Sequence, residues 1–391
     1  MIKSFKTFLK HTAKDFHNQS VNPPVVRAST IIFKSMQDIR KMQQRAVKDP
    51  IGGNFDYARQ GTSTTYTLQK ILTKLEESYH VFTTQTGFGS VFLAIFSVVR
   101  PGDEILVADP VYSPTRVLTE NFLREFNIKT IFYDPHDLKT LQKNITLKTK
   151  LIFVENPGSN TFDFQDLNKI ISIAKKNKIY TAIDNTWGTP YYFKPIKLGF
   201  DMSIVSATKY YSGHSDVMGG SLAVNKKVFP KVKIAEKITG QRLGPDDAYL
   251  ITRGLRTLDV RLDRHRENAK KVAEFLSKYK NIKLLYPYKK DSYNFRMWKK
   301  YYLGASGLMG LRIKAKSEKA VVKFVNNLKL FGHGYSWGGF ESLALHQNVR
   351  EQGNRNYLKL AKNEYIVRLH IGLEDPEDLI ADIKQALKSF K

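Results

Sequence analysis

The chain of 391 residues contains no cysteine. This absence excludes disulfide bonds, cysteine-based zinc sites and thiol catalysis, and it indicates a reducing compartment, which we expect to be the cytoplasm. The nine histidines do not show the H-x-x-x-H or H-E-x-x-H spacing of zinc sites, so we expect no metal. The longest apolar run, near 91–99, is too short to span a bilayer, and we expect no membrane association.

Acidic residues are few in comparison with basic ones. The 36 Asp and Glu residues against 63 Lys and Arg residues give a net charge of +27. Such a surplus can attract nucleic-acid phosphates. The basic residues are nevertheless spread along the whole chain, as at Lys175, Lys176 and Lys178, and there is no basic tail or recognisable nucleic-acid module. We therefore predict a lysine-rich solvated surface and no nucleic-acid partner.

The first part of the chain, residues 1–60, has little periodicity and contains Pro23-Pro24 and Gly52-Gly53, which favour irregular structure. Its basic beginning, residues 1–20, lacks the apolar centre of a signal peptide, so we expect a first helix or an arm. We predict an N-terminal arm over 1–60, a large domain over 61–245 and a small domain over 246–391.

Short apolar runs alternate with helical segments from about residue 64 to 225. This alternation predicts an α/β domain with a mostly parallel sheet that is covered on both faces. The expected helices include 67–79 and 164–176. The expected strands are 81–84, 104–108, 129–133, 151–155, 180–183, 202–206 and 221–224.

The last third of the chain has a different pattern, which predicts a smaller α+β domain. It begins with one long helical segment over 246–278. Asp375 and Pro376 form a typical helix start for the last helix, because Asp caps helices and Pro is accepted in the first turn. The other expected elements are strands at 282–286, 308–313 and 365–370, and helices at 317–328 and 376–390.

Lys209 and Asp184 each follow an apolar run, and the two runs are consecutive expected strands. A lysine flanked by Ser206 and Thr208 could form a Schiff base with pyridoxal phosphate (PLP), and the hydroxyls could bind its phosphate. Asp184 could keep the pyridinium nitrogen protonated. On this pattern alone, a solvated lysine and an Asp that caps a helix explain the residues equally well.

Two further polar residues favour the cofactor interpretation. Tyr112 and Asn156 also follow expected strand ends. In open α/β sheets, ligands bind outside the carboxyl ends of the strands. Four candidate residues at one edge of the sheet therefore indicate a binding site there.

Longer motifs extend this interpretation over most of the chain, from about residue 20 to the C-terminus. They are YARQGT (57–62), ENPGSN (155–160), IDNTWGTPY (183–191), SATKYYSGHSD (206–216), TRGLRTLDVRL (252–262), YSWGGFESL (335–343) and RLHIGLED (368–375). With these motifs the sequence resembles the Cys/Met-metabolism family of PLP-dependent enzymes. The resemblance implies an aspartate aminotransferase-type fold with a large PLP-binding domain. It also implies a homotetramer of catalytic dimers, with active sites shared between two chains.

The resemblance also implies roles for single residues. Lys209 would form the Schiff base and move the Cα proton, Asp184 would pair with the pyridinium nitrogen, and Tyr112 would stack on the ring; these three are the expected catalytic residues. Arg368 would bind the α-carboxylate of the substrate. The other expected contacts are Gly87, Phe88, Ser206 and Thr208 to the phosphate, Tyr57 and Arg59 to the phosphate of the adjacent subunit, and Tyr335, Ser336, Trp337 and Asn156 to the substrate.

Three features favour the β-lyase branch of this family. Tyr335 and Trp337 stand where γ-specific members usually carry other residues, Trp187 fits β-lyases, and the cysteine of methionine γ-lyases is absent. We therefore expect β-elimination of L-cystathionine to homocysteine, pyruvate and ammonia, a transsulfuration step of methionine biosynthesis. Activity of the cystathionine γ-lyase or γ-synthase type is the alternative. Asn156 and Phe88 depart from the small residues expected at their positions, which bears on the choice among cystathionine, cystine and other S-substituted cysteines.

Two other functions are alternatives for a chain with these residues. A minor alanine racemase activity is a hypothesis, because Lys209 and Tyr112 are expected on opposite sides of the substrate Cα. A noncatalytic binding protein with the same fold is disfavoured, since Lys209, Asp184 and Arg368 are all present.

Overall fold

The computed structural model describes residues 4–14, 19–287, 290, 292–350 and 355–390. Its larger sheet has seven strands in the order β1-β7-β6-β5-β4-β2-β3. The run β6-β5-β4-β2-β3 is parallel, and β7 is antiparallel to both β1 and β6. The predicted α/β class is therefore confirmed. The strands are β1 His80–Thr84, β2 Glu104–Ala108, β3 Lys129–Tyr133, β4 Thr149–Glu155, β5 Tyr180–Asp184, β6 Met202–Val205 and β7 Gly220–Val224.

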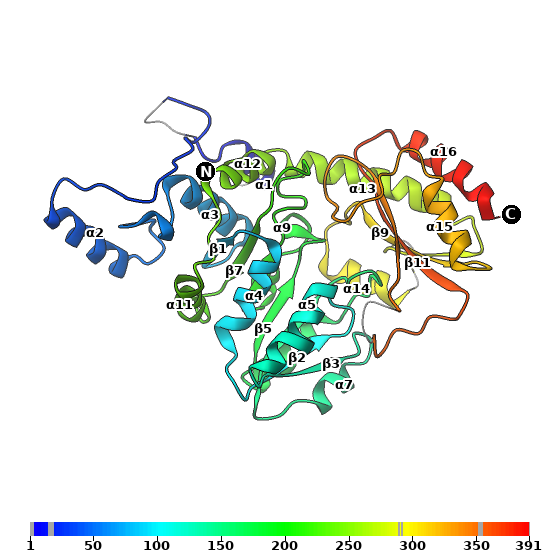
Figure 1. Cartoon of the computed structure of the whole chain (residues 1–391), viewed down its shortest axis with the longest axis horizontal. Coiled ribbons are helices and arrows are strands. Elements are labelled where there is room, and N and C mark those ends of the chain that lie inside the picture. The colour runs from blue at the N-terminus through cyan, green and yellow to red at the C-terminus, as the bar shows by residue number, and fades with distance from the viewer. Residues whose placement is uncertain (1–3, 15–18, 288–289, 291, 351–354, 391) are drawn as a thin grey trace.

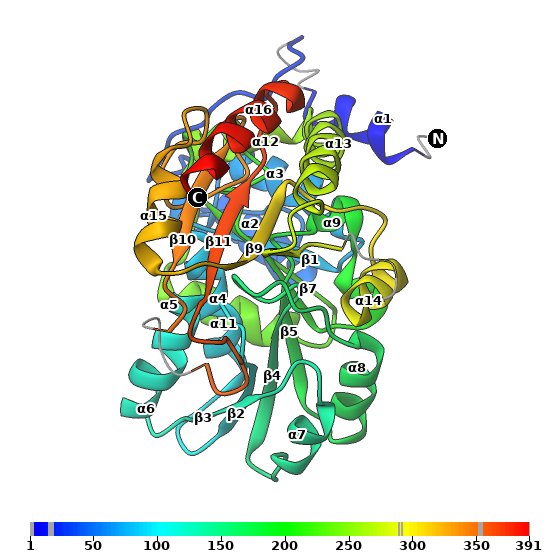
Figure 2. The same cartoon turned by 90° about the vertical axis from the view of Figure 1, so that its right-hand side faces the viewer.

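Helices cover both faces of this sheet because its strands are apolar on both sides. In β2, Leu106 and Ala108 belong to one apolar cluster, while Ile105 and Val107 belong to the other. Helices α3 and α8 contribute to the first cluster, and α4 and α11 to the second (Figures 1 and 2). The helices of this part are α3 Ser63–Glu76, α4 Gly87–Val98, α5 Ser113–Val117, η2 Leu118–Phe122, α6 Leu123–Glu125, α7 Leu138–Lys143, α8 Leu167–Lys176, α9 Thr189–Tyr192, α10 Pro195–Leu198 and α11 Phe229–Thr239.

The smaller sheet is antiparallel, with the order β10-β11-β9-β8. Its apolar residues pack against α13, α15 and α16 (Figure 2). The side chain of Asp375 accepts a hydrogen bond from the Glu377 N–H, so the predicted start of the last helix is confirmed. Strand β10 was not predicted. The elements are β8 Ile282–Leu285, α14 Tyr293–Tyr301, β9 Leu308–Lys314, α15 Glu318–Asn326, β10 Leu343–Gln347, β11 Glu364–His370, α16 Pro376–Leu387 and η3 Lys388–Phe390.

The single helix predicted over 246–278 is wrong, because two helices occupy this stretch. They are α12, Pro245–Leu255, and α13, Leu258–Leu276. The break allows Arg261, near the start of α13, to donate hydrogen bonds to the carbonyls of Tyr210 (2.8 Å) and Gly254 (2.7 Å). Tertiary hydrogen bonding therefore interrupts a pattern that is continuous in the sequence.

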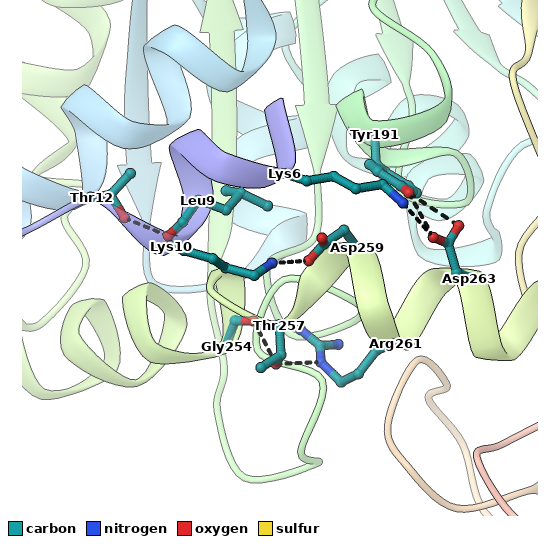
Figure 3. A network of polar contacts seen from close by, with 10 residues as sticks. All are labelled: Lys6, Leu9, Lys10, Thr12, Tyr191, Gly254, Thr257, Asp259, Arg261 and Asp263. Atoms are coloured by element: carbon teal, nitrogen blue, oxygen red, sulfur yellow. Dashed lines mark hydrogen bonds and ion pairs between the residues drawn. The ribbon is translucent and has the colours of Figure 1, made fainter. Parts of the chain in front are cut away.

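The N-terminal part contains α1 (Phe5–Lys10), which agrees with the expected first helix, and the short η1, Ala58–Gln60; a second helix, α2 (Met36–Lys48), lies within the stretch that was expected to be irregular. The first helix, α1, packs against the rest of the same chain. Its Leu9 is fully buried, Lys6 forms an ion pair with Asp263 at 2.8 Å, and Lys10 forms an ion pair with Asp259 (Figure 3). In contrast, α2 buries no residue and projects from the body (Figure 1).

The expected arm is therefore divided into a docked first helix and a projecting second one. Of the basic segment 1–20, residues 1–3 and 15–18 lie outside the described residues. The domain limits at 60 and 245 stay predictions. Within the described ranges, no helix has the length and apolarity needed to cross a membrane.

Candidate functional site

A cavity of about 590 Å³ opens at the carboxyl ends of β4, β5 and β6 and is closed on the other side by residues of the small sheet and its loops. Most of the predicted site residues line it. They are Gly87, Phe88, Tyr112, Asp184, Ser206, Thr208, Lys209, Tyr335, Ser336, Trp337 and Arg368. Segments that are far apart in the sequence thus meet at the sheet edge where ligands bind in α/β folds.

Lys209 follows β6, and its amine points to the loop that carries Ser336 and Trp337. The Nζ donates a hydrogen bond to Ser336 Oγ at 2.6 Å and lies 5.6 Å from the centre of the Trp337 ring. Burial lowers the pKa of Lys209 to about 8, and the Arg368 charge adds to this effect while Asp184 opposes it. The amine is therefore neutral more often near physiological pH than an ordinary lysine, and the neutral amine is the form that attacks a carbonyl or takes a proton.

Asp184 is the last residue of β5, and its carboxylate is buried next to the cavity. It accepts a hydrogen bond from the Thr186 N–H at 2.9 Å. Burial raises the pKa of Asp184, while the bonds to Thr186 and the Lys209 charge oppose that rise. A buried carboxylate with a raised pKa is stabilised by a cation placed beside it, as a protonated ring nitrogen would be.

The N-terminus of α4 forms an anion-binding feature at the other end of the cavity. The Thr86 side chain accepts the Gly89 N–H at 2.9 Å, so it caps the helix. A side chain at Gly87 would come within 2.5 Å of the Ser206 side chain, which shows how closely the Ser206 hydroxyl approaches the helix start. Backbone N–H groups at a helix start and a nearby hydroxyl suit a phosphate. Thr208 also lines the cavity, although its hydroxyl bonds with the Gly219 backbone.

Arg368 lies on β11 and approaches the cavity from the small sheet. Its Nη2 donates to the carbonyls of Ser336 (3.0 Å) and Gly334 (3.4 Å). Burial lowers the pKa of Arg368 to about 10, against the effects of Tyr112 and Tyr335. Since a guanidinium has five N–H donors, the remaining ones can bind a carboxylate in the cavity.

The loop that contains Tyr335, Ser336 and Trp337 is held in an unusual backbone conformation. Ser336 has a φ of 78°, a value that residues with a side chain rarely adopt. Trp337 packs edge-on against Tyr210 with ring centres 5.5 Å apart, whereas Tyr335 is 82% exposed. The hydrogen bonds of Ser336 to Lys209 and Arg368 therefore hold a strained residue at the centre of the site.

Three predicted site residues do not line this cavity. Asn156 is buried beside it and bonds to the Tyr302 hydroxyl and the Gln165 N–H, so its expected substrate contact stays a prediction. Tyr57 is exposed, and Arg59 donates to the Lys237 carbonyl at 3.3 Å. The role of Tyr57 and Arg59 in the site of an adjacent subunit stays a prediction.

Glu155 lines the cavity and was missed in the sequence. It ends β4 directly opposite Asp184 in the register of the sheet, and its Oε2 accepts the Tyr112 N–H at 2.6 Å. Burial and the Asp184 charge raise the pKa of Glu155 well above its usual range, while the Tyr112 N–H and the Arg355 charge oppose the rise. Its position at the end of an expected strand was the feature of the sequence that could have identified it as a site residue.

The profile of the Cys/Met metabolism PLP-dependent enzymes matches residues 6–388. A cystathionine β-lyase of Bordetella avium is 35% identical, with 98% of each chain covered. An L-alanine/L-glutamate racemase of Wolbachia pipientis wMel is also 35% identical and covers 94% of this chain and 92% of its own. The crystal structure of a cystathionine γ-synthase from Xanthomonas oryzae superposes with a TM-score of 0.89 at 28% identity, with 100% of this chain and 99% of that one covered. The chain therefore belongs to the family of PLP-dependent enzymes of cysteine and methionine metabolism.

Proposed function

We propose that this protein is a carbon–sulfur lyase that cleaves L-cystathionine by β-elimination to homocysteine, pyruvate and ammonia. The observation that carries the proposal is the double role of Ser336, which bonds to the Lys209 amine and to the Arg368 guanidinium. This residue holds a general base and a carboxylate-binding group at a fixed separation in one cavity. The likeness to the β-lyase of Bordetella avium supports this branch of the family.

The residues of the cavity fit PLP. Lys209 would hold its aldehyde carbon, Asp184 its ring nitrogen, and the start of α4 with Ser206 its phosphate. A side chain at Gly87 would fill the space at the helix start, which agrees with close approach of an anion there. When bound, PLP supplies the electron sink that stabilises the negative charge formed at the substrate Cα.

Two side chains of the protein would carry out the other steps of the reaction. Arg368 binds the substrate carboxylate and thereby orients Cα towards Lys209. Lys209 then takes the Cα proton, after which the bond between Cβ and sulfur breaks and the thiol of homocysteine leaves. Water converts the remaining three-carbon fragment into pyruvate and ammonia, so that one water is consumed for each cystathionine.

Product analysis tests this function. The purified PLP-loaded protein is incubated with L-cystathionine, and the keto acids and thiols are identified. Pyruvate with homocysteine is the expected result. The combination of 2-oxobutyrate and cysteine would instead establish γ-cleavage. This alternative is supported by the structural similarity to the cystathionine γ-synthase. Absence of turnover with bound PLP would contradict both and indicate another amino-acid substrate.

A racemase activity on L-alanine is the second candidate, supported by the likeness to the Wolbachia racemase. Lys209 and Tyr112 both line the cavity, and removal of a Cα proton can be followed by its return on the other face. Incubation of the pure enzyme with L-alanine should give D-alanine above the level of a Lys209→Ala control. If the two samples give equal amounts, the racemase proposal fails.

The lowered pKa of Lys209 predicts a pH dependence for the cofactor-free protein. Only the neutral amine attacks an aldehyde, and the neutral fraction grows as pH rises through the pKa. The rate at which the apoprotein captures PLP should therefore rise with pH and level off above about 8. An ordinary lysine would continue to gain reactivity up to about pH 10. Stopped-flow absorbance across this pH range would distinguish the two profiles.

We also propose a homotetramer in which Tyr57 and Arg59 complete the phosphate site of a neighbouring chain. Neither residue lines the cavity of its own chain. Arg59→Ala and Lys209→Ala proteins should each be inactive, while refolding them together should restore activity, because mixed assemblies contain sites with both native residues. If mixing restores nothing, Arg59 does not act across subunits; light scattering gives the number of chains.

A further inference from the structure

The chain between β10 and β11 returns to the large sheet and contacts the loop that carries Tyr112. The backbone N–H groups of Asn356 and Tyr357 donate to the two carboxylate oxygens of Asp109, at 3.1 and 3.2 Å. Asp109 directly follows β2 and lies shortly before Tyr112 in the chain. The small sheet is thus tied to the start of the Tyr112 loop.

Asp109 is also fixed by contacts with residues that pack on the large sheet. It forms a buried ion pair with Arg116 at 2.6 Å, and both side chains are almost fully buried. The backbone N–H of Arg116 donates to the Tyr112 carbonyl at 3.0 Å. A displacement of Asp109 would therefore move the loop and the Tyr112 ring with it.

Arg355 contacts both supports of this loop. Its Nη1 donates to the Asp109 carbonyl at 3.1 Å. Its charge also acts on Glu155, the carboxylate that accepts the Tyr112 N–H at 2.6 Å. One side chain from the connection before β11 therefore acts at both ends of the segment from Asp109 to Tyr112.

Several hydrogen-bond donors of the Arg355 side chain lack an acceptor in the described part of the chain. Its Nε and Nη2 are buried and have no hydrogen-bond partner among the described residues, which destabilises a folded protein. Burial and the nearby Arg116 charge lower the pKa of Arg355, although the charges of Glu155, Asp109 and Asp163 oppose this effect. A residue kept only for stability would not be expected to have these features.

We propose that Arg355 is a positioning residue for Tyr112: through Asp109 and Glu155 it couples the seating of the small sheet, which carries Arg368, to the ring of Tyr112. The inference rests on the proposed function only in that Tyr112 contacts the cofactor and substrate. Binding of a substrate carboxylate at Arg368 would then also fix the small sheet against the Tyr112 loop. Sequence motifs give no indication of this role.

Arg355→Met tests the proposal, because methionine keeps an unbranched apolar stem and removes the charge and all donors. We expect turnover to fall about tenfold through misplacement of Tyr112. The unfolding temperature should stay unchanged or rise, since unsatisfied buried donors are removed. The circular dichroism of the PLP band should change, because it reports the surroundings of the ring. Arg355→Lys, which can still donate to Asp109, should restore part of the turnover.

Arg350→Met is the matched control. Arg350 belongs to the same connection and also donates to carbonyls, those of Ala361 and Glu364, but it does not contact the Tyr112 loop. Turnover and dichroism should stay as in the wild type. Equal losses in both variants would overturn the proposal, as would wild-type turnover of Arg355→Met.

A double-mutant cycle separates positioning from general damage. In a Tyr112→Leu background, Arg355→Met should have no further effect on turnover or on the PLP dichroism, because both substitutions act through one group. Independent effects that multiply would overturn the proposal. The circular dichroism measurement needs no substrate, so this test remains valid if the protein does not cleave L-cystathionine. Turnover is then measured with the amino acid that the protein does cleave.

Discussion

Replacement of Lys209 with alanine is expected to lower the turnover of L-cystathionine by at least about a thousandfold. The substitution removes the general base, whose contribution alone is roughly 10²- to 10⁴-fold, and also the covalent attachment of PLP. Among the described residues that line the cavity, Lys209 is the only amine. No neighbouring side chain can therefore take its place. Steady-state kinetics and the visible absorbance of bound PLP measure the two losses separately.

Lys175→Ala is a suitable control for this experiment. Lys175 lies on the exposed side of α8, and its removal should leave both turnover and absorbance unchanged. Lys209→Arg keeps the positive charge but cannot serve as a base near neutral pH, so it should be as inactive as the alanine variant. Turnover above about a hundredth of the wild type in either Lys209 variant would contradict the assigned role.

Replacement of Arg368 with leucine is expected to lower kcat/KM by about two to three orders of magnitude. The substrate carboxylate would lose a charged, bidentate partner in a buried site, which typically costs about 2–5 kcal/mol. The fall should appear mainly in KM, since Lys209 and Asp184 remain. PLP absorbance should be retained, which separates loss of substrate binding from loss of the fold.

The same substitution should also alter Lys209. The Arg368 charge helps to lower the pKa of Lys209, so its removal should move the pH at which PLP capture levels off above about 8. Arg350→Leu removes a guanidinium that lies outside the cavity and should leave both measurements unchanged. An unchanged KM in Arg368→Leu would mean that another group binds the carboxylate.

Most strands of the large sheet could be predicted because turn-forming residues bound their apolar runs, as Gly102 and Asp109-Pro110 do for β2. Strand β10 could not, because Leu343–Gln347 consists of residues that do not favour strands, and apart from one bridge to Gly332 it pairs with β11. Its pairing is a tertiary effect. The same holds for the break before α13, where Gly254 is the only local signal and the hydrogen bonds of Arg261 are tertiary contacts.

The candidate site was predicted largely from strand ends and motifs, and Asn156 is the strand-end residue that the structure places outside the cavity lining. Adjacent residues at the end of a strand point in opposite directions. Glu155 therefore lies at the cavity and Asn156 bonds behind it to Tyr302. The contact of Glu155 with Tyr112 spans 43 residues of sequence, so no local pattern could reveal it.

The docking of α1 has a consequence for synthesis of the protein on the ribosome. Lys6 and Lys10 find their acidic partners 257 and 249 residues further along the chain. At translation rates of roughly 5–20 residues per second, these partners are made on the order of 10–50 s after the helix itself. The helix α1 is therefore made long before the residues that complete its native contacts, and its apolar Leu9 has to stay soluble in the meantime.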